Sequence, residues 1–313
     1  EGRWFDPKFK KDAAEPDARE NRLWSEAAAN SIVAACRGKK ATVTEEAKPA
    51  TQLAPQLFDL TSLQREANAR FGFSAKTTLA LAQSLYERHK ALTYPRTDSK
   101  HLPEDYIGTV KQTVESLGEI NNYYPFSAQI LNNGWVKPNK RIFDNSKISD
   151  HFAIIPTLQA PKSLTDIEAK LYDLVVKRFL AVFFPPAEFM VTTRISTVKA
   201  AGKEHKFQTN GKVMVKPGWL AVYGREAQED DANLVAVAPG EIVRTENVDV
   251  NALKTKPPAR YTEATLLSAM EGAGKLIDDD ELREAMAEKG LGTPATRAQV
   301  IEGLIAEKYM LRE

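Results

Sequence analysis

Cysteine is almost absent from this sequence, which has only Cys36 among 313 residues. No disulfide framework and no zinc site built on cysteine ligands can therefore form within the chain. Cys36 falls among the apolar positions of a helical stretch, which is typical of a buried structural thiol. The sequence also lacks any run of about 18 apolar residues and does not open on a signal-peptide pattern, which excludes a membrane span.

Net charge is nearly absent as well. Lys and Arg number 43 and Asp and Glu number 42, which leaves a formal charge of +1. The total charge therefore argues neither for nor against nucleic acid, and any basic surface must be local. The length is enough for two or three domains with cores of their own. The chain opens without an initiator Met and stops just past a predicted helix, so we expect it to be a piece of a longer protein.

Two parts of the chain have β character. In the first, a helix over residues 23–37 is followed by a strand at residues 41–44 and a proline-containing linker at residues 48–55. In the second, residues 189–256, apolar and polar residues alternate between Gly and Asn turn signals. Asn210-Gly211 is a good candidate for a two-residue hairpin turn.

The rest of the chain has helical patterns. Before the second β segment we predict one helix over residues 60–71 closed by Gly72, one capped by Ser74, one begun by Pro103 and one from Thr165 to Pro185-Pro186. After it we predict a helix over residues 263–271 capped by Thr262, an acidic helix over residues 278–289, and a helix opened by Thr293-Pro294. The plan is therefore mixed, helical, β-rich and helical again.

The segment Leu92 to Ser99 has the composition of a phosphate-handling site. Pro95 disfavours helix at Tyr94, and in an extended chain Tyr94, Arg96 and Asp98 point to the same side. Positive charge favours the phenolate of a tyrosine, whose free pKa is about 10, and a guanidinium can hold a phosphate through two hydrogen bonds. Nearby residues add a local basic cluster: Arg88, His89, Lys90, Lys100 and His101. On these residues alone, the alternative is a buried tyrosine beside a structural Arg–Asp pair.

Two further segments could bind phosphate. The run Ser149-Asp150-His151 precedes an apolar strand-like piece and could present His151 as a hydrogen-bond donor or acid, although a lone histidine is more often structural. The glycines of Gly290 to Arg297 lead into a capped helix start, where free backbone N–H groups attract an anion. Thr293, Thr296 and Arg297 would add side-chain donors, and an ordinary capped helix is the alternative.

In this order the segments resemble the type IA DNA topoisomerases, in particular topoisomerase III. Thr93-Tyr94-Pro95-Arg96-Thr97-Asp98-Ser99 matches the family's active-site pattern Thr-Tyr-(Pro/Met)-Arg-Thr-Asp-Ser, and the proline after the tyrosine is the topoisomerase III form. The segments Leu60 to Ala67, Ala82 to Glu87, Ser149 to Thr157 and Gly290 to Arg297 are similar to other conserved blocks of that family. Many members carry a second histidine where this chain has Phe152.

The fold that the resemblance implies is α+β and multidomain, the toroid core of a type IA topoisomerase. A helical catalytic domain at residues 56–186 would carry the active-site tyrosine. It would be inserted into a β-rich arch domain whose two parts are residues 1–55 and 187–256. A truncated helical base-domain segment would follow at residues 257–313.

The resemblance also implies a mechanism. Tyr94 would attack one DNA strand to leave a 5′-phosphotyrosine and a free 3′-hydroxyl, another strand would pass, and the hydroxyl would attack back without ATP. Arg96 would position the scissile phosphate and His151 would assist at the phosphate or the leaving oxygen. The candidates for contacts to single-stranded DNA are Gln83, Asp98, Arg260, Thr293, Thr296 and Arg297.

Family members carry an N-terminal Toprim domain whose carboxylates bind Mg²⁺, and no such domain precedes Glu1. We therefore expect Mg²⁺ to be held outside this chain, no metal ligands within it, and no relaxation of DNA by the chain alone. The acidic run Asp278 to Glu281 is better interpreted as a solvated face than as a substitute. The expected setting is a monomer in the bacterial cytoplasm, associated with the nucleoid, with a helicase or single-strand-binding protein as a possible partner.

Two rival functions are weighed against this one. A non-catalytic clamp for single-stranded DNA would keep the fold and bind without forming a covalent adduct. A tyrosine recombinase also forms a phosphotyrosine, but it would need several separated Arg and His residues, including a His-x-x-Arg pattern, and the sequence has none. The polarity of a trapped adduct would discriminate the two enzymes.

Overall fold

The computed structural model describes residues 1–12, 14–15, 17–227, 234–238, 240–276, 283–284, 286 and 290–312. The chain divides into two compact units. We call the first the sheet unit: Glu1–Gln52, Pro186–Gly218 and Arg225–Pro258. We call the second the helical unit: Leu53–Pro185, Trp219–Gly224 and Ala259–Glu313.

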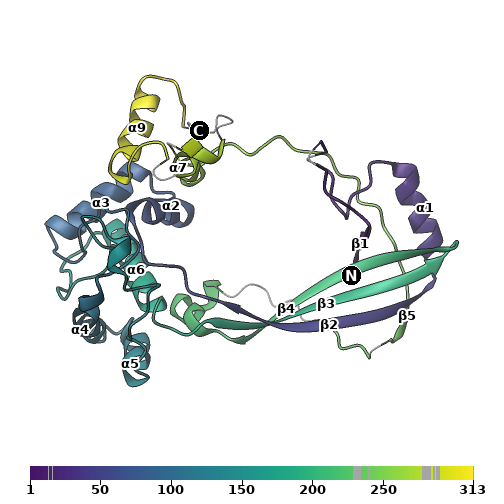
Figure 1. Cartoon of the computed structure of the whole chain (residues 1–313), viewed down its shortest axis with the longest axis horizontal. Coiled ribbons are helices and arrows are strands. Elements are labelled where there is room, and N and C mark those ends of the chain that lie inside the picture. The colour runs from purple at the N-terminus through teal and green to yellow at the C-terminus, as the bar shows by residue number, and fades with distance from the viewer. Residues whose placement is uncertain are drawn as a thin grey trace. The chain divides into compact units, whose positions relative to one another are not determined.

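The sheet unit is built on an antiparallel sheet with the order β1-β4-β3-β2-β5 (Figure 1). Its strands are β1 (Arg3–Phe5), β2 (Lys40–Gln52), β3 (Ala187–Ala200), β4 (Lys203–Lys216) and β5 (Ile242–Arg244). Strands β2 and β3 pair from Ala41 opposite Val198 to Gln52 opposite Ala187, although the whole helical segment between them separates them in sequence. The α+β fold with a helical segment inserted into a β-rich part is thus confirmed.

Helix α1 (Glu26–Cys36) begins at Ser25, whose hydroxyl accepts the Ala28 N–H, and it ends on the small apolar core of the sheet unit. Cys36, Ala41 and Val198 form that core, and Cys36 is fully buried. Burial raises the pKa of the Cys36 thiol above its ordinary value. The prediction of a buried structural thiol is confirmed.

The predicted linker at residues 48–55 is wrong, because β2 continues through Pro49 to Gln52. Pro49 lies opposite Met190 of β3, while on the other side of β2 the strand β5 pairs only with Lys40 to Thr42. Among the described residues, then, Pro49 stands on the unpaired edge of the sheet. A proline is tolerated there because its missing N–H costs no ladder hydrogen bond.

The predicted hairpin turn at Asn210-Gly211 is also wrong. Both residues lie inside β4, opposite Thr193 and Thr192. The turn between β3 and β4 is formed instead by Ala201 and Gly202, whose φ angles are 49° and 71°. Two positive φ angles are what a two-residue type I′ turn requires. The long ladder between β3 and β4 therefore fixes where the chain turns, and it overrides the local preference of Asn-Gly.

The helical unit contains α2 (Leu60–Phe71), α3 (Ala75–Glu87), α4 (Ile107–Leu117), α5 (Tyr124–Asn132), α6 (Asp166–Ala181), α7 (Glu263–Glu271) and α9 (Pro294–Ala306). The predicted helix ends at Gly72, Ser74, Thr165 and Thr262 are all found, because each depends on a local cap. Helix α6 stops at Ala181, earlier than predicted, and α5 was not predicted. Most residues of the predicted acidic helix at 278–289 lie outside the described part of the chain.

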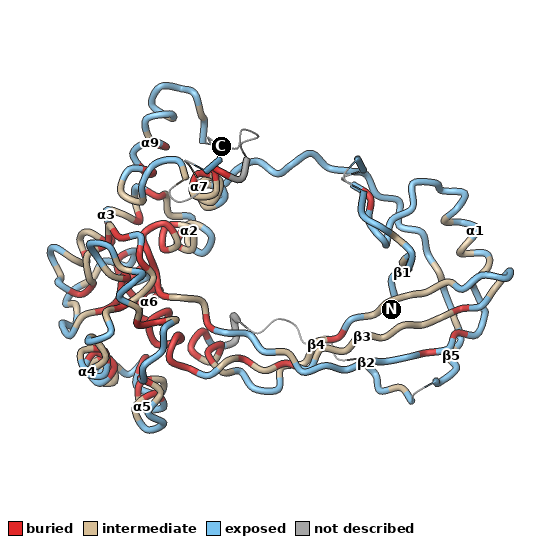
Figure 2. The backbone as a smooth tube through the Cα atoms, in the orientation of Figure 1, coloured by how far each residue is buried: buried red, intermediate tan, exposed pale blue. Residues whose placement is uncertain are grey.

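The buried core of the helical unit runs along α2, α3 and α6 (Figure 2). Helices α7 and α9 join it through a second cluster, in which Leu267, Met270 and Ile301 pack on Ala75 at the start of α3. Burial of such side chains contributes about 1.5–3 kcal/mol each. The C-terminal helices therefore belong to the same compact unit as α2 to α6. Within the described residues, no helix is both long enough and apolar enough to cross a membrane.

Candidate active site

Tyr94 lies in an irregular segment just after α3. Lys90 turns the chain with a left-handed φ of 53°, and the Ala91 N–H donates to the Leu85 carbonyl to close the helix end. Leu92 then forms a β-bridge with Pro156. Tyr94 itself is partly buried, and Pro95 after it is buried. The predicted departure from helix at the tyrosine is confirmed.

Hydrogen bonds from Thr93 hold the tyrosine segment against the segment that carries His151. The Thr93 N–H donates to the Ile155 carbonyl at 3.0 Å, and its hydroxyl donates to the Ala153 carbonyl at 2.9 Å. The same hydroxyl accepts the Ile155 N–H at 2.9 Å. Satisfied backbone and side-chain groups on both segments fix their register.

A second set of bonds lies on the other side of Tyr94. The Thr97 hydroxyl donates to the carbonyl of His151 at 3.0 Å, and the Thr97 carbonyl accepts the N–H of Leu60 at the start of α2. The Ser99 hydroxyl donates to the Lys147 carbonyl at 2.8 Å. Threonines on both sides of Tyr94 therefore anchor its backbone while its own side chain is left out of that network.

The structure brings Tyr94 and His151 together. Their ring centroids are 4.2 Å apart with the planes tilted by 45°, and His151 is exposed to solvent. The ring of Tyr86 from α3 meets Tyr94 edge-on at 5.5 Å. An imidazole beside a phenol is well placed to donate to a phosphate that the phenol oxygen approaches.

Arg96 and Asp98 do not pair with each other. Arg96 is partly buried and has no carboxylate partner within the described part of the chain. Asp98 is exposed and accepts a long hydrogen bond of 3.4 Å from the Ser149 hydroxyl. The alternative of a structural Arg–Asp pair is therefore not found, and the Arg96 guanidinium is available to an anion.

The basic cluster predicted around Tyr94 is partly neutralised. Lys100 lies 3.4 Å from a carboxylate oxygen of Asp59, and His89 Nε2 lies 3.3 Å from one of Glu168. The second contact is an ion-pair distance rather than a hydrogen bond, because His89 Nε2 has no hydrogen-bond partner among the described residues. Burial lowers the pKa of His101. Of this cluster, Arg88 and Lys90 are the exposed cations.

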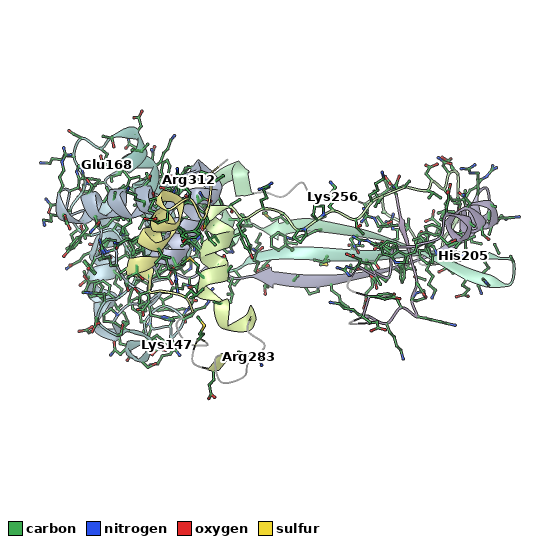
Figure 3. The ribbon with its side chains drawn as sticks, turned by 90° about the horizontal axis from the view of Figure 1, so that it is seen from above. Lys147, Glu168, His205, Lys256, Arg283 and Arg312 are labelled. Atoms are coloured by element: carbon green, nitrogen blue, oxygen red, sulfur yellow. The ribbon has the colours of Figure 1, made fainter. Side chains whose placement is uncertain are left out.

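Glu168, labelled in Figure 3, ties α6 to α3 beneath this segment. It stands at the third position of α6, where its carboxylate accepts the Ser84 hydroxyl at 2.7 Å and both the N–H and the hydroxyl of Thr165. Its side chain is 7% exposed. The bond from Ser84, followed by those from Thr165, lowers the pKa of Glu168 from 4.5 to about 2.

Glu168 is expected to make stability depend on acid. Its folded pKa lies below the unfolded value of 4.5, so its contribution is complete above that pH and is lost as the pH falls toward 2. Glu168→Gln should lower the free energy of unfolding by about 2 kcal/mol at neutral pH, with solvent screening taken into account, and by much less near pH 3. Urea unfolding at several pH values measures this difference. Glu87→Gln, at an exposed position of α3, is the control, and a pH-independent difference for Glu168→Gln would contradict the assignment.

The remaining candidates are placed less uniformly. Thr293 and Thr296 are exposed at the start of α9, where the Thr293 N–H donates to the Thr296 hydroxyl at 2.9 Å. Arg297 is 3% exposed, and it donates to the Leu291 carbonyl and the Thr61 hydroxyl inside the protein. Burial lowers its pKa. This geometry favours a structural role for Arg297 and does not support a direct contact to DNA.

Gln83 is partly buried on α3, and Arg260 is exposed. Among the described residues, no group of three His, Cys, Asp or Glu side chains could hold a metal ion. The described residues therefore do not fit a resident Mg²⁺ site. The acidic run Asp278 to Glu281 lies outside them.

Comparison with known proteins gives the class of this chain. A family model described as DNA topoisomerase matches residues 5–313. The chain belongs to the DNA topoisomerase family. Its fold is similar to that of full-length topoisomerase I from Thermotoga maritima, with a TM-score of 0.67 and 23% identity over 95% of this chain and 45% of that one.

Among relatives, DNA topoisomerase 3 of Bacillus subtilis is 41% identical over 299 residues, which are 92% of this chain and 40% of that protein. DNA topoisomerase 3 of Bacillus licheniformis is 42% identical over 296 residues, 91% of this chain and 40% of that protein. The predicted likeness to type IA enzymes of the topoisomerase III kind is thus confirmed. The chain spans about 40% of the length of these relatives.

Sequence reasoning missed the residues that position the site. Thr93 and Thr97 were read only as parts of a motif, whereas their hydroxyls pin the tyrosine segment to the histidine segment. Tyr86, which touches Tyr94, was seen only as an inward-facing helix residue. Two threonines flanking an extended Tyr-Pro-Arg were the available signal, because such hydroxyls often bond to neighbouring backbone.

Proposed function

We propose that this chain is the strand-cleaving core of a type IA DNA topoisomerase, with Tyr94 as the nucleophile. One observation carries the proposal: the ring of Tyr94 lies 4.2 Å from that of His151, between segments joined through Thr93 and Thr97. Membership of the DNA topoisomerase family supports the same function.

The reaction follows from the chemistry of a phenol and a phosphodiester. The Tyr94 oxygen attacks the phosphorus of one strand, so that the new O–P bond forms while the bond from phosphorus to the 3′-oxygen breaks. The phenol loses its proton and the leaving 3′-oxygen gains one. A second strand passes through the gap, and the 3′-hydroxyl then attacks the phosphotyrosine to restore the strand. The bond energy is kept in the protein–DNA link, so ATP is not needed.

Arg96 and His151 act on the phosphate in this proposal. Arg96 has no carboxylate partner among the described residues, so its guanidinium can take two phosphate oxygens and stabilise the charge that develops on them. His151 is exposed beside Tyr94 and donates to the phosphate or to the leaving oxygen. The Thr93 and Thr97 bonds hold both side chains in place, as a preorganised site requires.

The metal and the wider DNA contacts complete the proposal. We infer that Mg²⁺ is bound by a domain outside this chain, and no step above passes through it. Single-stranded DNA is the substrate, with Gln83, Asp98, Arg260, Thr293 and Thr296 as candidate contacts. We further propose a monomer in the bacterial cytoplasm, associated with the nucleoid, that works with a helicase or a single-strand-binding protein.

A covalent adduct trapped from the full-length protein tests this function. The DNA is expected to be joined through its 5′ phosphate, so the adduct should resist a 5′ exonuclease and be digested by a 3′ exonuclease. An adduct through the 3′ phosphate would fit a tyrosine recombinase instead. Tight binding of single strands with no adduct under any condition would favour the non-catalytic clamp.

The 313-residue chain alone is expected to bind single-stranded DNA without relaxing it. Binding through phosphates releases counterions, so log affinity should fall against log salt with a slope of about −0.7 per neutralised phosphate. Fluorescence anisotropy with a labelled oligonucleotide measures the slope, and a duplex of the same sequence is the control. Relaxation of supercoiled plasmid with Mg²⁺ by this chain alone would contradict the assignment of the metal site to another domain.

A further inference from the structure

A pocket of about 300 Å³ lies in the helical unit, directly beside the tyrosine segment. Its walls come from Thr93 and Lys90 before Tyr94, from Tyr106 and Thr109 at the start of α4, and from the loop at residues 156–159. Ligand pockets in proteins start at about this volume, which suits one nucleotide unit better than a larger group.

The lining of this pocket is chemically mixed and carries no negative charge. The side chains of Tyr106, Pro156 and Leu158 are apolar or aromatic, whereas those of Thr109, Thr157 and Gln159 are polar and uncharged. Lys90 is the only charged side chain among the described residues that line it. A nucleotide combines a flat ring with an anionic phosphate, which matches apolar walls with a cation at the rim.

Lys90 connects the pocket to the candidate nucleophile. It is exposed, and its ammonium lies 5.8 Å from the ring centre of Tyr86, whose edge in turn meets Tyr94. Its φ of 53° is rare for a residue with a side chain, and the Thr157 hydroxyl holds the turn by donating to the Lys90 carbonyl at 2.6 Å. Strained backbone of this kind gathers at ligand-binding sites.

We propose that this pocket binds the nucleotide on the 3′ side of the cleaved bond, with Lys90 at the phosphate that follows it. The inference rests on the proposed function, since Tyr94 would hold the 5′ phosphate of that same nucleotide. The pocket would then retain the covalently held end of the strand while the gap is open. An isolated anion site would not need the apolar walls formed by Tyr106 and Leu158.

The test uses the 313-residue chain carrying Tyr94→Phe, which removes covalent chemistry, and a 5′-phosphorylated single-stranded oligonucleotide. A photoreactive 4-thiothymidine is placed at its first position. Cross-links are expected on the peptide that contains residues 156–159 or on the one that contains Tyr106. Thr109→Phe, which fills the pocket from α4, is expected to remove them, and circular dichroism checks that this variant is folded.

Charge removal provides a second and milder test. Lys90→Asn keeps a residue that tolerates left-handed backbone, and it is expected to weaken oligonucleotide binding about threefold to tenfold and to reduce the salt slope by about 0.7. Lys111→Gln removes an exposed charge from α4 outside the pocket and is expected to change neither quantity.

Four outcomes would overturn the pocket assignment. The first is cross-linking elsewhere, and the second is cross-linking unaffected by Thr109→Phe. The third is an equal effect of Lys90→Asn and Lys111→Gln. The fourth is loss of the cross-links when inorganic phosphate replaces chloride at equal ionic strength, which would leave only an anion site. All four leave the proposed cleavage function standing, because that function depends on adduct formation by the full-length protein with Tyr94 intact.

Discussion

Tyr94→Phe in the full-length protein is expected to abolish covalent capture of DNA while single-strand affinity stays within about twofold of wild type. Only the attacking oxygen is removed, and the ring contacts with Tyr86 and His151 remain available to phenylalanine. Capture is measured by stopping the reaction with denaturant and separating protein–DNA adducts on a gel. Affinity is measured by anisotropy on the same preparations.

Tyr86→Phe is the matched control for this experiment, because Tyr86 is the neighbouring tyrosine and touches Tyr94. It is expected to retain capture, since its hydroxyl takes no part in the proposed attack. An adduct formed by the Tyr94→Phe variant would show that another group is the nucleophile. Capture lost in Tyr86→Phe and kept in Tyr94→Phe would exchange the roles of the two residues.

Arg96→Lys should slow cleavage by about 10²–10³, although the charge is conserved, because a preorganised donor at the transition state contributes this much. A guanidinium offers two parallel donors to a phosphate, whereas an ammonium is a point charge. The rate of adduct formation in a single turnover measures the effect. Arg88→Lys, at an exposed arginine of the same basic cluster, is the control and should leave the rate unchanged.

A cleavage rate for Arg96→Lys within about twofold of wild type would mean that Arg96 supplies charge alone. A comparable loss in Arg88→Lys would instead mean that the whole cluster acts through its field. These results separate a bidentate contact from general attraction, which the position of Arg96 alone does not do.

Helix ends could be predicted from the sequence because their physics is local. Ser74, Thr165 and Thr262 each bond to a backbone N–H three residues on, so a short window contains the whole cause. Gly72 likewise ends α2 through its own left-handed φ of 69°. The order of the helical and β segments followed from the same periodic patterns.

Features set by strand pairing could not be predicted in this way. Pro49 was taken for a linker residue and Asn210-Gly211 for a turn, yet both lie within strands whose partners are distant in the sequence. A proline or an Asn-Gly pair states a local preference, and a long ladder of hydrogen bonds overrides it. Whether a strand has a free edge depends on its neighbours, which the local window does not contain.

The candidate site shows the same division. Tyr94, Arg96 and His151 were chosen correctly as chemistry-bearing residues for a phosphate site, but only the folded chain brings Tyr94 and His151 to ring contact. Arg297 stands in a motif that suggested an anion site, and the structure turns its guanidinium inward to Thr61 and Leu291. Sequence patterns identify side chains, whereas their direction is decided by packing.

The pairing of Gln52 with Ala187 has a consequence for folding kinetics. These residues end β2 and begin β3, so the polypeptide leaves the sheet and returns to it at neighbouring positions. Bringing such distant positions together costs chain entropy that grows with the length of the intervening loop. Once the inserted helices have folded and their two ends lie close, most of that cost is gone. The β2–β3 ladder is therefore a late event, with zippering of the sheet waiting on the insertion that it brackets.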